Sequence, residues 1–351
     1  MCCIKYILED PLSVKNLHLR IGTRGSALAL WQARLVQARI RERHPDLTVE
    51  LIPIKTTGDK ILDVPLAKVG GKGLFVKELE EAMLDGRADL AVHSMKDVPA
   101  QFPPGLILGP LLERADPRDA LLSVNHDGLA TLPPGARVGS SSLRRRSQLL
   151  ALRPDLEILP LRGNVNTRID KMVAGEYHAI ILAAAGVQRL QLTQHVVEYL
   201  DSDRMLSAIG QGAIGIEMRA DDPQIAAILD PLNHPPTRLC VRAERAFLAT
   251  LEGGCQVPIG GHARLDGSTL SLEGIVAGVT GTPLIRGRRR GPVNDPEALG
   301  VALARELLDR GAREILEELK ALSAFDTGPD FVPSVPSVPP VPPIPPIPSL
   351  T

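Results

Sequence analysis

The stretch ARVGSSSLRRRSQLLALRPDLEILPLRGNVNTR (residues 136–168) alternates short apolar runs with segments of helical spacing. Together with the apolar segment that follows it, this stretch predicts five elements: strand 136–140, helix 142–152, strand 156–163, helix 164–175 and strand 177–186. Strands and helices that alternate in this way are typical of a parallel α/β unit.

The same alternation occurs earlier in the chain. The expected elements are strand 17–22, helix 26–45, strand 47–54, helix 74–86 and strand 88–95. Ser26 is the expected N-cap of the first helix, and Pro45 ends it. Two similar α/β lobes follow from these patterns, with a ligand expected where the carboxyl ends of their strands face each other.

The pattern changes near residue 235. A helix at 237–254, alternating strands within 263–278 and a final helix at 296–322 predict a smaller α+β domain. Nine of the 31 prolines fall in the last segment, FVPSVPSVPPVPPIPPIPSLT (331–351), which we expect to be extended or disordered outside the fold.

Composition points to a small ligand and not to a polymer or a membrane. The 351 residues carry 40 Lys and Arg against 41 Asp and Glu, so the net charge is −1, and aromatic residues make up only 3%. The four cysteines form no CxxC pair, which disfavours a disulfide framework or a zinc site and fits a reducing cytosol. With no secretory h-region and no run of eighteen apolar residues, we expect a cytoplasmic protein.

Arginine is nevertheless concentrated in one place. Residues 141–168 hold six arginines and two acidic residues, and several of the arginines stand beside Ser or Asn where a strand meets a helix. Helix N-termini and guanidinium groups together bind carboxylates or phosphates. The residues expected to bind an anion are Arg24, Ser26, Ser140, Ser142, Arg144, Arg145, Arg162 and Arg168.

Two further stretches suggest chemistry. In VHSMKDVP (92–99), Lys96 and Asp97 follow a buried strand, so Asp97 is a candidate general acid or base, whereas His93 is expected to be packed inside the strand. In GQGAIG (210–215), a strand and not a helix follows the glycines, so we interpret it as a close backbone crossing between lobes and not as a dinucleotide site.

Cysteines stand in two contrasting settings. Cys240 lies within a predicted helix and is expected to be a packing residue. Cys255 lies in LEGGCQVPIG (251–260) between glycines and a Gln-Val-Pro turn, where both a reactive and a packing role remain open.

Seven stretches in order resemble the porphobilinogen deaminase (hydroxymethylbilane synthase) family: RIGTRGSALALWQA, PLAKVGGKGLFVKELE, VHSMKDVP, GSSSLRR, LRGNVNTR, AIGQGAIGIE and LEGGCQVPIGG. These stretches lie between Arg20 and Gly261, and the resemblance as a whole covers about residues 17–322, nearly the whole chain. It implies two similar lobes of the type II periplasmic-binding-protein kind and a smaller α+β C-terminal domain. The implied limits are 1–16 for an N-terminal extension, 17–112 with 213–230 for lobe 1, 116–206 for lobe 2, 235–325 for the α+β domain with the cofactor cysteine, and 326–351 for the tail.

The resemblance also implies the reaction. Four porphobilinogen molecules are joined head to tail with loss of ammonia, and hydrolysis releases the linear tetrapyrrole hydroxymethylbilane. The chain grows on a dipyrromethane cofactor bound through a thioether to Cys255, with no metal and no nicotinamide. Asp97 is then the catalytic carboxylate that stabilises cationic pyrroles and relays their protons.

Each pyrrole of such a chain carries an acetate and a propionate, which accounts for the local excess of arginine. The resemblance implies that these carboxylates bind Arg24, Ser26, Lys96, Ser142, Arg144, Arg145, Arg162 and Arg168, with Ser140, Arg189 and Gln211 beside them. We also expect hinges near 109–117 and 208–215 and a glycine-rich cover within 56–73.

Two other functions fit parts of the pattern. A two-lobed organic-anion binding protein has the same architecture without a catalyst, and a pyridoxal phosphate enzyme could use Lys96 in an amine-releasing reaction. Porphobilinogen is the expected partner in the favoured interpretation, with no nucleic acid and no membrane, and the protein is expected to be a monomer.

Overall fold

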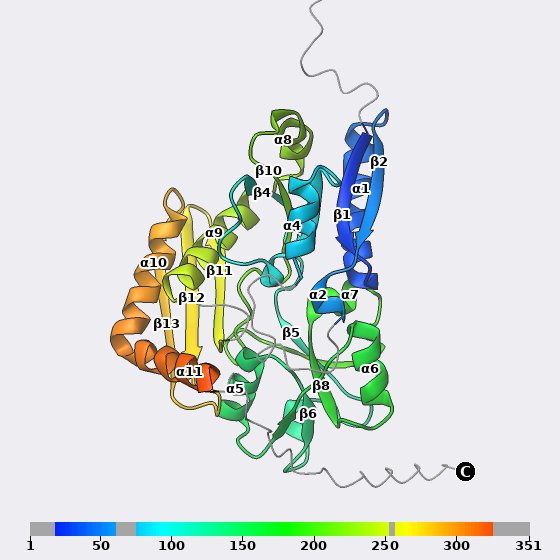
Figure 1. Cartoon of the computed structure of the whole chain (residues 1–351). Coiled ribbons are helices and arrows are strands. Elements are labelled where there is room, and N and C mark those ends of the chain that lie inside the picture. The colour runs from blue at the N-terminus through cyan, green and yellow to red at the C-terminus, as the bar shows by residue number, and fades with distance from the viewer. Residues whose placement is uncertain (1–17, 61–74, 253–256, 326–351) are drawn as a thin grey trace, which may run out of the picture.

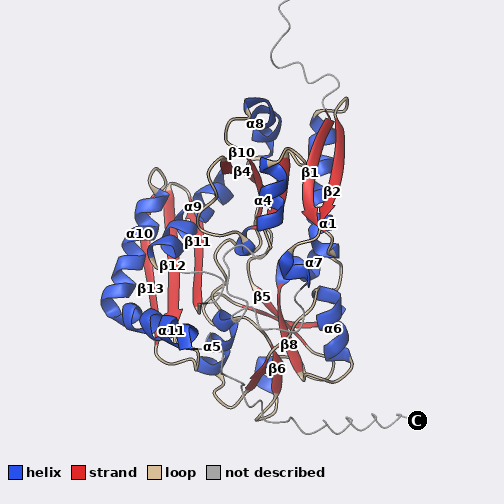
Figure 2. Ribbon diagram, viewed as in Figure 1, coloured by secondary structure: helices blue, strands red, loops and turns tan. Residues whose placement is uncertain are grey.

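A computed structural model describes residues 18–60, 75–252 and 257–325 (Figure 1). The predicted N-terminal extension, the proline tail, Cys255 and most of the expected cover lie outside these described residues. Within the described part, two five-stranded sheets and one three-stranded sheet form three layered bodies (Figure 2).

The first sheet, drawn mainly in blue and cyan in Figure 1, has the order β2-β1-β3-β10-β4. Its strands are β1 (His18–Arg24), β2 (Thr48–Ile54), β3 (Leu90–Ser94), β4 (Leu106–Leu111) and β10 (Ile214–Arg219). The first three run parallel, whereas β10 is antiparallel to both of its neighbours.

Helices cover both faces of this sheet. The covering helices are α1 (Ala27–Arg43), α4 (Lys77–Leu84) and α8 (Pro223–Leu229), and the single-turn helix α2 (Thr57–Lys60) follows β2. Ala33, Val36 and Ile40 recur at helical spacing and pack against buried strand residues such as Ile21. The predicted cap is confirmed, because the Ser26 side chain accepts a hydrogen bond from the Ala29 amide.

The second sheet, drawn in green in Figure 1, repeats the same connectivity in the order β7-β6-β8-β5-β9. Its elements are β5 (Asp119–Leu122), β6 (Arg137–Gly139), α5 (Leu143–Leu152), β7 (Glu157–Leu159), α6 (Val165–Val173), β8 (Ala179–Ala183), α7 (Ala184–Arg189) and β9 (Val196–Leu200). In each sheet the antiparallel strand, β10 or β5, follows directly after the chain has crossed from the other lobe. The expectation of two similar α/β lobes is therefore confirmed.

Two sequence-based boundaries in this lobe were wrong. The predicted strand 177–186 ends at Ala183, because the alanines that follow start helix α7. The predicted strand 156–163 is shorter and ends at Leu159, where Pro160 has no N–H to continue a ladder.

The third body packs helices on an antiparallel sheet of order β11-β12-β13. Its elements are α9 (Pro235–Thr250), β11 (Ile259–Asp266), β12 (Thr269–Ala277), β13 (Leu284–Pro292), α10 (Pro296–Leu307) and α11 (Arg313–Phe325). The predicted final helix is divided in two near Gly311, whose φ is 103°. The α+β character of this body is confirmed.

The lobes are joined by two crossing segments, residues 112–118 and 201–213. The amide of Ala115 donates to the carbonyl of Gly212 at 3.2 Å, so the two segments touch. A Cβ on Gly212 would lie 2.5 Å from the Ala115 oxygen, and the φ of Gly212 is +87°. This agrees with the close backbone crossing predicted from GQGAIG. No helix within the described ranges is long and apolar enough to span a membrane.

Candidate active site

Lys96 and Asp97 lie where lobe 1 faces lobe 2. They belong to a 3-10 turn (Met95–Asp97) directly after β3, as the sequence predicted. Burial lowers the pKa of the Lys96 ammonium; attraction to Asp97 opposes this, and repulsion from Arg145 lowers the pKa further. The acid and the lysine of lobe 1 therefore lie within electrostatic reach of the arginines of lobe 2.

Side chains from β1 and α1 border the same place. A small pocket at the carboxyl ends of β1 and β3 is lined by residues that include Arg24, Ser26, Gln32, Phe75, Ser94 and Asp97. The carboxyl ends of these strands thus meet the N-terminus of α1, as expected for a ligand site of an α/β lobe.

Arg24 has a partner that the sequence did not reveal. Its guanidinium donates to Asp59 of α2, with an Nη2–Oδ1 distance of 2.5 Å, and it stacks on Phe75 with 4.2 Å between Cζ and the ring centroid. Burial raises the pKa of Asp59, but hydrogen bonds from Arg24 and Thr56 outweigh this and lower it. Arg24 is thereby held at the edge of the pocket.

The arginines of α5 surround a buried acid. Ser142 caps the helix by accepting from the Arg145 amide, and Ser140 lies just before it at the end of β6. Asp119 of β5 is fully buried and accepts from Arg144 Nη1 at 2.7 Å and from Arg145 Nη2 at 2.8 Å. Burial raises the pKa of Asp119, but the two arginine charges outweigh this and hold it well below its usual value. One carboxylate thus offsets part of the positive charge that the sequence assigned to a ligand.

Gln211 joins this group from the second crossing segment. Its side-chain amide donates to Asp119 Oδ1 at 3.0 Å and to the carbonyl of Pro117 at 2.7 Å. Asp119 therefore connects β5, α5 and the crossing, and reasoning from the sequence missed it. The one available signal was an acid at the head of an otherwise apolar strand.

Arg162 and Arg168 stand at the start of α6, where Asn164 caps the helix by accepting from the Thr167 amide. Arg168 Nε donates to the carbonyl of Gly163 at 2.8 Å. Burial lowers the pKa of Arg168 to about 10, and repulsion from Arg145 and Arg162 adds to this. Burial likewise lowers the pKa of Arg162. We call Lys96, Arg145, Arg162 and Arg168 the basic cluster.

Arg189 is engaged elsewhere in the described structure. Its Nη2 donates to the carbonyl of Gly212 at 2.7 Å, and its guanidinium lies 5.6 Å from the ring centroid of Trp31. Burial lowers its pKa to about 10. In this conformation it bridges α7, the second crossing and α1.

His93 and Cys240 are packing residues, as the sequence predicted. His93 is buried in β3 with its Nε2 at 2.9 Å from Glu217 Oε2, in agreement with a packed histidine. Cys240 is buried in α9, also as predicted, and burial raises the pKa of its thiol to about 11. Cys255 lies outside the described residues.

The donor set suits a ligand with several carboxylates. The basic cluster brings four cationic side chains from both lobes beside two capped helix N-termini, and burial works against the charge of each. Desolvated cations gain more from an anionic ligand than solvated ones do. Among the described residues, no group of three His, Cys, Asp or Glu side chains could hold a metal ion.

Comparisons with known proteins agree on one family. Residues 19–227 match the family model described as "Porphobilinogen deaminase, dipyromethane cofactor binding domain", and residues 238–309 match "Porphobilinogen deaminase, C-terminal domain". The chain is 57% identical over 301 residues to a porphobilinogen deaminase of Geobacter sulfurreducens, covering 86% of this chain and 94% of that protein.

Two solved structures with a similar fold resemble the chain loosely. The periplasmic aliphatic sulphonate binding protein SsuA of Escherichia coli is 15% identical with a TM-score of 0.38, covering 67% of this chain and 70% of that one. The periplasmic VFT2 domain of Bordetella pertussis BvgS is 13% identical with a TM-score of 0.39, covering 61% and 85%. The two family models and the high identity decide the assignment: the chain belongs to the porphobilinogen deaminase family.

Proposed function

We propose that the protein is an enzyme of the transferase class that joins four porphobilinogen molecules head to tail and releases hydroxymethylbilane by hydrolysis. Membership of the family is the observation that carries this proposal. The placement of Asp97 against the basic cluster supports it, because the reaction needs one acid and many cations in the same cleft.

A dipyrromethane primer on Cys255 belongs to the proposal. When bound, this group supplies the pyrrole carbon to which the first substrate is joined. Its acidic side chains match the cationic donors described above. The residues proposed to hold primer and product carboxylates are Arg24, Ser26, Lys96, Ser140, Ser142, Arg144, Arg145, Arg162, Arg168, Arg189 and Gln211.

Asp97 takes up the proton that each condensation releases. The carbon–nitrogen bond of the incoming substrate breaks with loss of ammonia, a carbon–carbon bond forms, and one proton leaves the attacked pyrrole carbon. The carboxylate of Asp97 stabilises the positive charge on the ring and accepts that proton. Lys96, the adjacent residue, binds a carboxylate of the same substrate.

Part of the basic charge is neutralised before any ligand binds. Asp119 pairs with Arg144 and Arg145, so these two side chains are held in fixed positions. The negative charge of Asp119 also reduces the repulsion between the neighbouring cationic side chains. A growing product then competes for donors that already lie in the right place.

The setting of the enzyme follows from its chemistry. Thioether formation requires a reduced Cys255 thiol, so we place the activity in the cytoplasm. We propose that the enzyme acts on a small-molecule substrate, without nucleic acid or membrane, since its net charge is −1 and its cations are local. We also propose that it works as a monomer.

The deciding experiment is intact-mass measurement of protein made in cells that supply porphobilinogen. Wild type and Cys240→Ala are expected to carry an adduct of two pyrrole units, whereas Cys255→Ala is expected to have only its polypeptide mass. Cys240 is the matched control because its thiol is buried in α9. Asp97→Asn is expected to keep the adduct and to lose most of its ammonia release.

Two results would contradict the proposal. An adduct-free wild type that still polymerises porphobilinogen would remove the primer from the mechanism. A wild type that binds porphobilinogen without releasing ammonia would favour the organic-anion binding protein instead.

A further inference from the structure

We infer that Arg245 is a positioning residue that holds the loop following Asp97 (residues 98–102) in place, and this inference rests on the proposed function. Arg245 belongs to α9 in the third body, whereas Asp97 belongs to lobe 1. The connection between them is made by the backbone that directly follows Asp97.

Three consecutive carbonyls of that backbone accept from a single guanidinium. Arg245 Nη2 donates to the oxygens of Pro99 and Ala100 at 2.7 and 2.9 Å, and Nη1 donates to that of Val98 at 3.4 Å. The planar fork of arginine suits several oxygens at fixed angles. Pro99 has no N–H, so this loop holds one backbone donor fewer, and the three carbonyls accept from a side chain outside the loop instead.

The contact is partly buried. The Arg245 guanidinium lies 5.2 Å from the ring centroid of Phe102, which belongs to the same loop. Burial lowers the pKa of Arg245 to about 10, and attraction to Glu217 opposes this. Beside it, Val241 of α9 packs with Met95 and Val98 on either side of Lys96 and Asp97. Hydrogen bonds from a partly desolvated guanidinium therefore add to an apolar contact at the turn that contains Asp97.

The same helix also holds the connection between the lobes. Glu244, the residue before Arg245, accepts from the Gly210 amide at 2.7 Å and from Arg114 Nη1 at 2.5 Å. One residue of α9 thus binds both crossing segments, and the next binds the loop of the acid. Cys255 follows the last residue of α9, Thr250, by five positions in the sequence. Arg245 consequently sets where Asp97 stands relative to the helix that leads to the primer cysteine.

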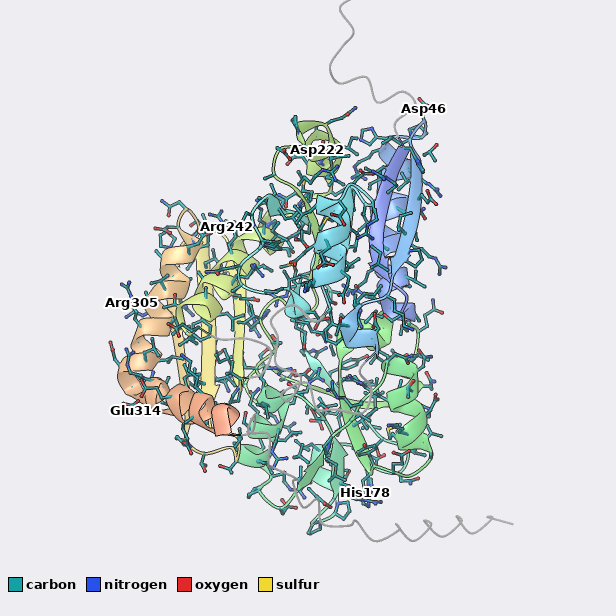
Figure 3. The ribbon with its side chains drawn as sticks, viewed as in Figure 1. Asp46, His178, Asp222, Arg242, Arg305 and Glu314 are labelled. Atoms are coloured by element: carbon teal, nitrogen blue, oxygen red, sulfur yellow. The ribbon has the colours of Figure 1, made fainter. Side chains whose placement is uncertain are left out.

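This role makes a specific prediction for turnover. Arg245→Met is expected to lower kcat about 100-fold and to leave KM within about twofold, because misplacing a catalytic group by about 1 Å has an effect of this size. Arg245→Lys keeps the charge and part of the donor set, so its kcat is expected to be about tenfold higher than that of Arg245→Met. Arg242→Met is the matched control, since Arg242 is a residue of the same helix (Figure 3) that is exposed and pairs with Glu297.

A double-mutant cycle separates positioning from general stability. In Asp97→Glu, which keeps a carboxylate but moves it, adding Arg245→Met is expected to lower kcat by less than about threefold. Turnover is measured as ammonia release from porphobilinogen at a temperature where every variant is folded by circular dichroism, and primer attachment is measured by intact mass. All Arg245 variants are expected to keep the adduct.

Equal losses of kcat from Arg245→Met in both backgrounds would show that Arg245 acts independently of Asp97 and would overturn the inference, as would unchanged kcat in Arg245→Met. If Arg245→Met does not fold, Arg245→Lys is tested in the same cycle against the same criteria. An inactive, adduct-free wild type would instead reject the proposed function itself.

Discussion

Glu244 is predicted to stabilise the junction of all three bodies, and replacing it with Gln tests this directly. The side chain is fully buried, and its oxygens accept from Arg114, from the Gly210 amide and from the Ala263 amide at 2.8 Å. Burial raises the pKa of Glu244, but the charges of Arg114 and His262 outweigh this and lower it from 4.5 to about 2. A carboxylate with so low a pKa is more stable in the folded chain than in the unfolded one.

The magnitude follows from this pKa. A decrease of about 2.5 pKa units corresponds to a contribution of about 3 kcal/mol to the free energy of unfolding at pH 7. Because the folded pKa is lowered, this contribution is complete above the unfolded pKa of 4.5 and is lost as the pH falls toward 2. At pH 3 less than half of this contribution remains. Removing one partner of a buried ion pair costs a similar amount, about 3–5 kcal/mol, since Arg114 is left buried without its counter-charge.

Urea unfolding at pH 7 and pH 3 provides the assay. Glu244→Gln is expected to lose about 3–5 kcal/mol at pH 7 and clearly less at pH 3. Glu297→Gln is the matched control, because Glu297 pairs with Arg242 of the same helix but both side chains are nearly half exposed, and it is expected to lose less than about 1 kcal/mol. If both variants lost the same stability, or if the loss in Glu244→Gln did not depend on pH, the reasoning would be refuted.

Three further tests address other parts of the structure, two of them with a matched control substitution. Asp119→Asn should cost about 3–5 kcal/mol in urea unfolding because its two arginine partners lose their counter-charge. Asp201→Asn, in an ion pair whose acid is 76% exposed, should cost less than about 1 kcal/mol. Gly212→Ala should lose about 3 kcal/mol or more by the same assay, because φ is positive and the new Cβ meets a backbone oxygen. Gly135→Ala, with positive φ but open space, should lose only about 1–2 kcal/mol. Burial, followed by repulsion from a neighbouring acid, raises the pKa of Glu80 to about 7, so the folded chain loses stability as the pH rises from 4.5 through 7. Glu80→Gln should therefore raise the urea midpoint at pH 8 and change it little at pH 4; the opposite pH dependence would contradict this.

Local signals in the sequence were sufficient for much of the architecture. Ser26, Ser142 and Asn164 each stand directly before a helical pattern, and each caps a helix in the structure. Capping and periodicity depend on residues three or four positions apart, so they can be recognised without the fold. The same holds for Lys96 and Asp97, whose place after a strand follows from the pattern around them.

Boundaries were less certain where propensity and tertiary contacts compete. The alanines after β8 suit a continued apolar strand as well as a helix, and the structure makes them helix α7. Apolar runs of this length do not distinguish the two by periodicity alone.

The sequence by itself determined two α/β lobes and a third α+β body, and it predicted a group of arginines near an acid. Only the tertiary structure decided which charges the protein neutralises internally. Asp119 meets Arg145 across 26 positions and Gln211 across 92, and Glu244 meets Arg114 across 130. Pairings at such separations depend on how the lobes and helices pack and not on any local pattern. The free-energy cost of burying each charge is offset only when a distant element places an opposite charge beside it.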